Sequence, residues 1–315
     1  YTALTCKLLM EHLSRNKEGG KQPPKILSLK EVPAEVKKQL LNLCRLSWEG
    51  LVRQQLTFSS HAVGGDTLGL MHAVPELYGG EDGQLSYHFI HLTLQEFLSA
   101  FHISQLPPDT QQQVIEQHVS TGHLTMAVRF FFGLTEPSTF TSSLTSQLLH
   151  ITSQEDSQSA SVYHWLYEAG DVGKLTEGLG AGEEVRVRSS YTWSPLDYYI
   201  VGHVISQCNF RWELNFSGAS MGDEGMEMLC KGMKSSTETT CKEISKLDLV
   251  FNNISVEGVK WLQHIPLHML QLIKKLDVGG NELDRNALIA LSEAVPKLTG
   301  LQKLSLQDNP IGEGG

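Results

Sequence analysis

Hydrophobic positions recur at a fixed spacing in the last third of the chain. Three segments align without gaps and share the order aliphatic-x-x-Leu-x-aliphatic-x-x-Asn: 244–252, 273–281 and 301–309. Their central leucines are Leu247, Leu276 and Leu304, so the intervals are 29 and 28 residues. Alternation of apolar and polar residues predicts a short strand with one buried face. The region is therefore expected to contain three equivalent strands.

This spacing resembles the leucine-rich repeat, L-x-x-L-x-L-x-x-N. The asparagine is expected to turn the chain, with its amide paired to backbone groups that leave the strand. Between strands, Val259, Leu262 and Ile265 recur at helical spacing, which predicts a helix in each repeat. Leu214 and Phe216 indicate an earlier, degenerate repeat. We therefore predict a ribonuclease-inhibitor-like α/β leucine-rich-repeat solenoid over residues 206–315.

Charged residues alternate with the repeat leucines, on the strand face opposite the core. They form two columns across the repeats: Lys246, Lys275 and Lys303 in one, and Asp248 and Asp277 in the other. One interpretation is a solvated charge ladder whose columns neutralise each other. The other is a binding surface for a ligand or partner. The sequence leaves both open.

The first half of the chain has a different pattern. A helix is expected from Pro33 to about Leu51, because proline is favoured in a first helical turn and apolar residues follow at helical spacing. Extended stretches at 70–78 and 85–91 surround a glycine-rich turn at 79–83, which predicts a β-hairpin. Helices followed by a hairpin indicate a winged-helix domain.

A histidine precedes the next expected helix. Thr93 and Glu96 form a capping-box pattern that predicts a helix start at Thr93, so that His91 lies just ahead of the helix N-terminus. Unpaired backbone N–H groups at a helix N-terminus attract anions. A histidine at this position can donate to a phosphate oxygen while its other nitrogen is held by the protein.

Four segments, in chain order, resemble those of NOD-like receptors. They are Leu29–Pro33, Leu43–Gly50, Tyr87–Ala100 with the sequence YHFIHLTLQEFLSA, and Ser194–Gly202. Within the third block, Ser99 replaces the usual alanine. The resemblance implies an α+β multidomain chain: a winged-helix region over 1–105, a second helical domain and linker over 106–205, and repeats over 206–315. It also implies a fragment cut from a longer receptor.

In that family the histidine matching His91 contacts the β-phosphate of bound ADP and holds the receptor closed. The resemblance therefore implies an ADP/ATP switch, with the nucleotide bound mostly by residues outside this chain. It also implies cytoplasmic location, a protein or microbial ligand bound through the repeats, and homo-oligomerisation on activation. No G-x-x-x-x-G-K-[ST] loop or other catalytic motif occurs in the sequence, so we expect no enzymatic activity from this chain.

Composition narrows the alternatives. The formal net charge of −10 over 315 residues disfavours nucleic-acid binding, including DNA binding by a winged helix. No apolar run reaches membrane-spanning length. Five scattered cysteines indicate reduced thiols rather than a disulfide framework. Two alternatives remain: a repeat scaffold for protein interactions without nucleotide switching, and an extracellular repeat receptor, supported by sequons at Asn215 and Asn253.

Overall fold

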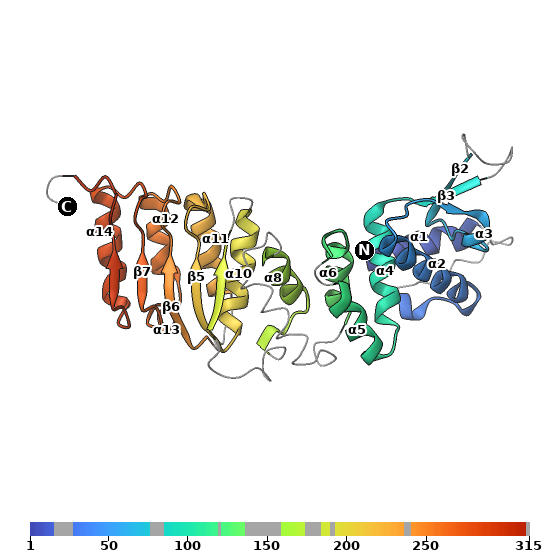
Figure 1. The fold of residues 1–315 in the computed structure, drawn as a ribbon, viewed down its shortest axis with the longest axis horizontal. Helices are drawn as coiled ribbons and strands as arrows, with labels where there is room; N and C mark the ends of the chain where they lie inside the picture. The colour runs from blue at the N-terminus through green and yellow to red at the C-terminus, as the bar shows by residue number, and fades with distance from the viewer. Residues whose placement is uncertain are drawn as a thin grey trace. The chain divides into compact units, whose positions relative to one another are not determined.

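The structure is a computed structural model of the 315-residue chain (Figure 1). It describes residues 1–15, 28–75, 85–118, 121–135, 159–173, 184–189, 193–235 and 241–312. The chain forms two compact units, Tyr1–Thr135 and Glu136–Gly315, each with its own core.

The first unit combines helices with a small sheet. In chain order its elements are α1 (Thr2–Arg15), η1 (Leu29–Glu31), α2 (Ala34–Val52), β1 (Phe58–Ser59), α3 (Ser60–Val63), β2 (Met71–Pro75), β3 (Leu85–Phe89), α4 (Leu92–Ser104), α5 (Pro108–His118), η2 (Gly122–Leu124) and α6 (Thr125–Leu134). The expected helix is confirmed, with Pro33 as its N-cap. The expected hairpin is confirmed as the antiparallel pair β2–β3. Its glycine-rich turn at 79–83 lies outside the described residues.

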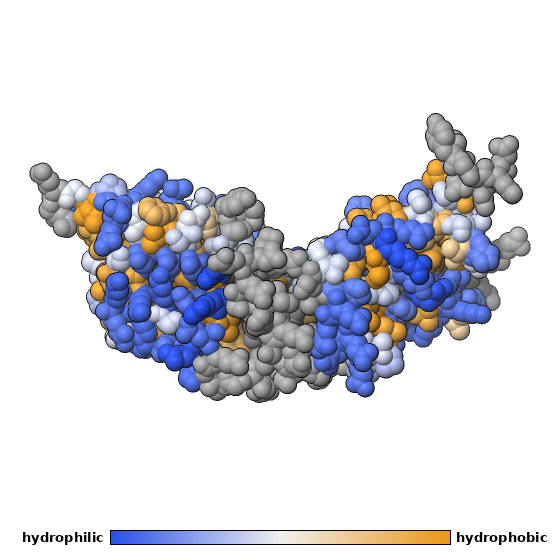
Figure 2. All heavy atoms as spheres, in the orientation of Figure 1, coloured by the Kyte–Doolittle hydropathy of each residue, from blue (hydrophilic) through white to orange (hydrophobic). Residues whose placement is uncertain are grey.

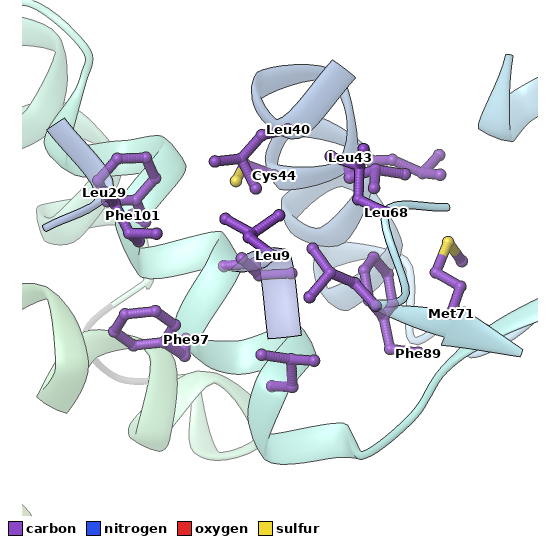
Figure 3. Close-up of a cluster of buried hydrophobic side chains, with 14 of the residues drawn as sticks. Leu9, Leu29, Leu40, Leu43, Cys44, Leu68, Met71, Phe89, Phe97 and Phe101 are labelled. Carbon is purple, nitrogen blue, oxygen red and sulfur yellow. The ribbon is translucent and has the colours of Figure 1, made fainter. Parts of the chain in front are cut away.

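The core of this unit lies between α1, α2 and α4. Leu9 from α1 contributes to it together with Leu40 and Leu43 from α2 and Phe97 from α4, and all are buried. Figure 3 shows these side chains directed toward one interior, with Phe89 from β3 beside them. Helix α4 therefore packs against the periodic apolar face of α2.

The three-stranded sheet has the order β1-β3-β2. Met71 pairs with Phe89, and both are buried, so this face of the hairpin covers the core. The neighbouring positions, His72 and His88, are also directly opposite each other. Because side chains alternate between the faces of a strand, this histidine pair lies on the face away from the core.

The second unit is a five-stranded parallel sheet with helices between its strands (Figure 1). Its described elements are α8 (Ser159–Glu168), β4 (Glu184–Arg188), α10 (Pro195–Gln207), β5 (Arg211–Asn215), α11 (Gly222–Lys234), β6 (Glu243–Asp248), α12 (Val256–Lys260), η4 (Trp261–His264), α13 (Leu267–Leu270), β7 (Lys275–Asp277), α14 (Arg285–Ala294), η5 (Val295–Lys297) and β8 (Lys303–Ser305). The strand order β4-β5-β6-β7-β8 follows the sequence order.

The strand register is the one that the sequence alignment predicts. Leu214 pairs with Leu247, Leu247 with Leu276, and Leu276 with Leu304. The first three are buried and Leu304, in the last strand, is partly buried. The spacing between equivalent leucines in the sequence is therefore the number of residues from one strand to the next strand of the sheet.

A ladder of asparagine side chains closes each of the last three repeats after its strand. The Asn281 amide donates to the carbonyls of Leu249 and Val278, at 2.8 and 3.0 Å. Its side-chain oxygen accepts from the backbone N–H of Asn252 and of Ile254, both at 3.0 Å. Each asparagine thus satisfies backbone groups of its own repeat and of the preceding one, as the sequence predicts.

The sheet begins earlier than the expected start of the repeats at residue 206. Strand β4 pairs in parallel with β5 over Glu184–Arg188. The two boundaries expected from the sequence, 105/106 and 205/206, each lie inside one of the two compact units. The three-part division remains a prediction about domain identity.

Helices α10 and α11 approach each other closely at two glycines. A Cβ atom at Gly202 would overlap the carbonyl oxygen of Leu229. A Cβ at Gly232 would overlap the backbone of Tyr199 in the same way. Glycine is required at both positions because no side chain fits between the two backbones. Among the described helices of either unit, none is long and apolar enough to cross a membrane.

Candidate functional site

His91 joins the hairpin to helix α4. It is exposed and is the N-cap of this helix, which begins at Leu92. This corrects the expected capping box: Thr93 lies in the first turn instead of preceding it. The helix begins before Thr93 because the ring of His91 accepts from the backbone N–H of Thr93, which is the second residue of the helix.

The hydrogen bond of this cap determines the donor of the ring. Nδ1 of His91 accepts from the backbone N–H of Thr93 at 3.1 Å. A neutral imidazole with an accepting Nδ1 carries its hydrogen on Nε2. His91 therefore presents Nε2–H as a donor on an exposed side chain, at the end of a helix where partial positive charge accumulates. This arrangement is suited to an anionic acceptor such as a phosphate oxygen.

The start of α4 is fixed to α2 by buried polar groups. The backbone oxygen of Gln95 accepts from the hydroxyls of Ser47 and Ser99, at 3.1 and 2.8 Å. The Gln95 amide donates to the backbone oxygen of Gln55 at 3.3 Å. Ser99, which replaces the alanine usual in the resembling family, thus bonds only within its own helix turn. These contacts hold the turn that carries His91 in a fixed position.

A second titratable group lies beside His91. Burial raises the pKa of the Glu96 carboxyl, and the electrostatic interaction with His91 acts in the opposite direction.

The predicted charge columns lie on the face of the repeat sheet opposite its core. Lys275 pairs directly with Lys303, and Asp248 with Asp277. Lys246 donates to the Asp248 carboxylate at 2.6 Å, and this hydrogen bond raises the pKa of Lys246 against the effect of burial. The lysine and the aspartate of the β6 repeat thus neutralise each other.

The later repeats differ. Lys275 and Lys303 are exposed, and neither forms an ion pair with the part of the chain that the structure describes. Both also lack a carboxylate directly across the sheet, because each is the other's register partner. Hydrophilic side chains cover most of the visible surface of this unit, with apolar ones scattered among them (Figure 2). The two lysines form a positive patch at the C-terminal end of the sheet face.

Sequence reasoning missed two features of this face. Arg186, on β4, forms an ion pair with Glu213 on β5 at 2.9 Å, which extends the charge columns by one strand. The alternation Glu-Val-Arg-Val-Arg at 184–188 is the signal that predicts this strand. It is weak because the strand has no leucine and no asparagine after it.

The second missed feature is Phe251, at the rim of the face. Its side chain is 60% exposed, and its backbone has a φ of 53°. The equivalent position is glycine in the next repeat, Gly280, and aspartate in the last, Asp308. Gly280 and Asp308 also have a positive φ, so the left-handed backbone belongs to the repeat turn, where a bulky residue costs free energy. No repeat pattern predicts an aromatic residue at this position.

Metal and thiol chemistry are limited in the described part of the chain. No group of three or more histidine, cysteine or acidic side chains there is arranged to hold a metal ion. All five cysteines are buried. Burial raises the pKa of the Cys241 thiol to about 12, which leaves it unreactive.

Comparison with known proteins identifies the repeats. The family model described as Leucine Rich repeat matches residues 213–230 and 241–262. These two matches cover β5 with α11 and β6 with the helical segment that follows it. The search of curated proteins found no match. The chain therefore contains leucine-rich repeats, a module that commonly mediates protein binding.

Proposed function

We propose that this chain is the winged-helix, helical and repeat portion of a cytoplasmic NOD-like receptor. In this proposal the leucine-rich repeats sense a protein or microbial ligand, and the first unit senses bound ADP through His91. Exchange of ADP for ATP releases the winged helix and allows the receptor to oligomerise. The chain itself has no catalytic role, because the nucleotide is bound mostly by residues outside it.

The observation that carries the proposal is the hydrogen-bond state of His91. Its Nδ1 is occupied by the Thr93 N–H, its Nε2–H is the donor, and the side chain is exposed. A charge-assisted hydrogen bond to phosphate is worth about 1.5–3 kcal/mol. Loss of that contact would shift a closed–open equilibrium about ten- to a hundredfold.

The sensing role is assigned to the face of the repeat sheet. Lys275 and Lys303 provide a cationic patch, and Phe251 provides an exposed aromatic side chain at the rim. Exposed aromatic residues supply much of the binding free energy in protein interfaces, while charged residues add specificity and speed of association. We propose a protein ligand with acidic and apolar groups for this face.

The test is ligand-free signalling by the full-length protein with His91→Ala. Basal signalling is expected to rise, because the closed state loses its contact with the β-phosphate. His61→Ala is the matched control, since His61 is also exposed and lies in the same unit. Unchanged basal signalling in the His91 variant, with ADP still bound, would contradict the switch.

The second candidate is a repeat scaffold without nucleotide switching. The observation that favours it is that the family match covers the repeats alone. This candidate predicts that the full-length protein purifies without nucleotide and that His91→Ala changes nothing but the local helix cap.

A further inference from the structure

The exposed face of the hairpin carries two histidines at directly opposed positions. His72 on β2 pairs with His88 on β3 in the antiparallel register. Directly opposed residues in such a pair have Cβ atoms about 4.5–5.5 Å apart and project to the same side. The backbone therefore holds both imidazoles side by side on a surface away from the core.

Both rings are available for a ligand. His72 is exposed and His88 is partly exposed. Within the described residues, neither ring forms a hydrogen bond or an ion pair. The two rings contact each other. This distinguishes them from His12, His91 and His164, whose ring nitrogens are occupied by Asp66, Thr93 and Asp197.

The ring geometry is close to that of a shared metal ion. The two ring centroids are 5.8 Å apart, with an angle of 47° between the planes. Two imidazoles that bind one tetrahedral Zn²⁺ through nitrogens at about 2.0–2.1 Å have centroids roughly 5 Å apart. Small rotations of the two side chains cover that difference, and the backbone of the hairpin stays in place.

We propose that His72 and His88 form a binding site for a divalent transition-metal ion of the Zn²⁺ type. Neutral imidazole nitrogen is a preferred ligand of such ions, whereas Mg²⁺ and Ca²⁺ prefer oxygen. Two protein ligands leave the remaining coordination positions to water.

The bound ion links β2 to the strand that leads into α4. β3 ends at Phe89, two residues before the helix cap at His91. A metal bridge between the strands reduces opening of the hairpin, because opening separates the two ligands. The expected consequence is protection of the β2–β3 backbone hydrogen bonds when metal is present.

The test is isothermal titration of ZnCl₂ into the untagged 315-residue chain, with His72→Gln and His88→Gln as separate variants. Mutation of residues that only support metal ligands already costs about 10–100-fold in affinity, so loss of either ring should weaken binding by at least about tenfold. The controls are His61→Gln and His268→Gln, two exposed histidines on other elements, which should keep wild-type affinity. MgCl₂ should produce no saturable binding.

Hydrogen exchange gives an independent measurement. Zn²⁺ should slow exchange at 71–75 and 85–89 in the wild-type chain and in both controls, but not in the His72 or His88 variants. Exchange elsewhere in the first unit reports whether each variant is folded. Absence of saturable zinc binding, or equal binding by the wild type and either hairpin variant, would overturn the proposal.

Discussion

The two units satisfy their buried polar groups in different ways. In the repeat unit, Asn252 and Asn281 are buried at equivalent positions and make equivalent bonds to the preceding repeat. In the first unit, Ser47, Gln95 and Ser99 are also buried, but they form one cluster that occurs once. The repeat unit uses the same solution at each step, whereas the first unit depends on contacts between residues far apart in the sequence.

This difference indicates which substitutions should destabilise each unit most. One asparagine in the ladder serves two repeats, so its loss affects the register of both. The polar cluster of the first unit joins α4 to α2 and to Gln55 just after α2, inside a core whose stability comes mainly from apolar burial. Substitutions in the ladder should therefore destabilise more than substitutions in the cluster.

The largest effect is expected for Asn281→Ala. The change removes donors to the Leu249, Val278 and Gly279 carbonyls and the acceptor for two backbone N–H groups. Buried groups left without partners cost about 1–3 kcal/mol each, and partial entry of water reduces the sum to about 3–5 kcal/mol. Urea unfolding followed by tryptophan fluorescence measures this loss, because all the tryptophans except Trp48 lie in the repeat unit.

Two other asparagines serve as controls for this prediction. Asn309, in the last repeat, is partly exposed, so Asn309→Ala should cost less than Asn281→Ala. Asn286 is exposed on α14 and bonds only to Asp284, so Asn286→Ala should stay within about 0.5 kcal/mol of the wild type. Equal losses for Asn281 and Asn286 would show that the ladder does not hold the repeats together.

A smaller effect is expected for Gln95→Ala in the first unit. The variant loses the amide bond to Gln55 and leaves a cavity beside Ser47, with an expected cost of about 1–2 kcal/mol. Ser99→Ala removes a hydroxyl that bonds only within its own helix, so its cost should stay below about 0.5 kcal/mol. Hydrogen exchange at the α2 and α4 amides measures both. A larger loss for Ser99→Ala than for Gln95→Ala would contradict the described cluster.

The smallest effect concerns pH and the link between α8 and α10. Burial acts to raise the pKa of Asp197, but hydrogen bonds from His164 and Ser194 outweigh it, so the pKa lies below its ordinary value of 3.8. A carboxyl with a depressed pKa in the folded state stabilises the fold above its unfolded pKa. This contribution is lost as the pH falls through the folded value. Stability carried by Asp197 is thus present at neutral pH and lost below about pH 4.

Urea midpoints of the wild type and Asp197→Asn, compared between about pH 3 and pH 7, measure this contribution. The variant should be less stable at neutral pH, and the difference should shrink at the acidic end. Asp109→Asn, at an exposed position on α5, is the matched control. A difference between Asp197→Asn and the wild type that does not change with pH would contradict the assignment.

The sequence predicts the two units unequally, and the ladder explains why. Leu247, Leu276 and Leu304 occur at a constant interval, so a single sequence is sufficient to predict their register. β4 escapes the same reasoning because Val185 and Val187 carry no leucine–asparagine pattern. The close approach of Gly202 to α11 is equally unpredictable, since it depends on how two helices pack.

For the candidate sites the limits are similar. The sequence places His91 before a helix and predicts a nitrogen held by the protein. It cannot indicate that the histidine itself replaces threonine as the cap. The columns Lys246, Lys275 and Lys303 are predictable from the repeat. Which of these lysines pairs with a carboxylate depends on side-chain geometry. Lys246 pairs with Asp248, whereas the other two lysines have no carboxylate partner in the described chain.

The most direct test of the proposed nucleotide switch is the nucleotide content of the purified full-length protein. Bound nucleotide would be released by acid, separated by chromatography and quantified for the wild type and for His91→Ala. We expect ADP in stoichiometric amount in the wild type and a clearly lower amount in the variant. Absence of nucleotide from the wild type, or the same ADP content and exchange rate in both proteins, would contradict the role of His91.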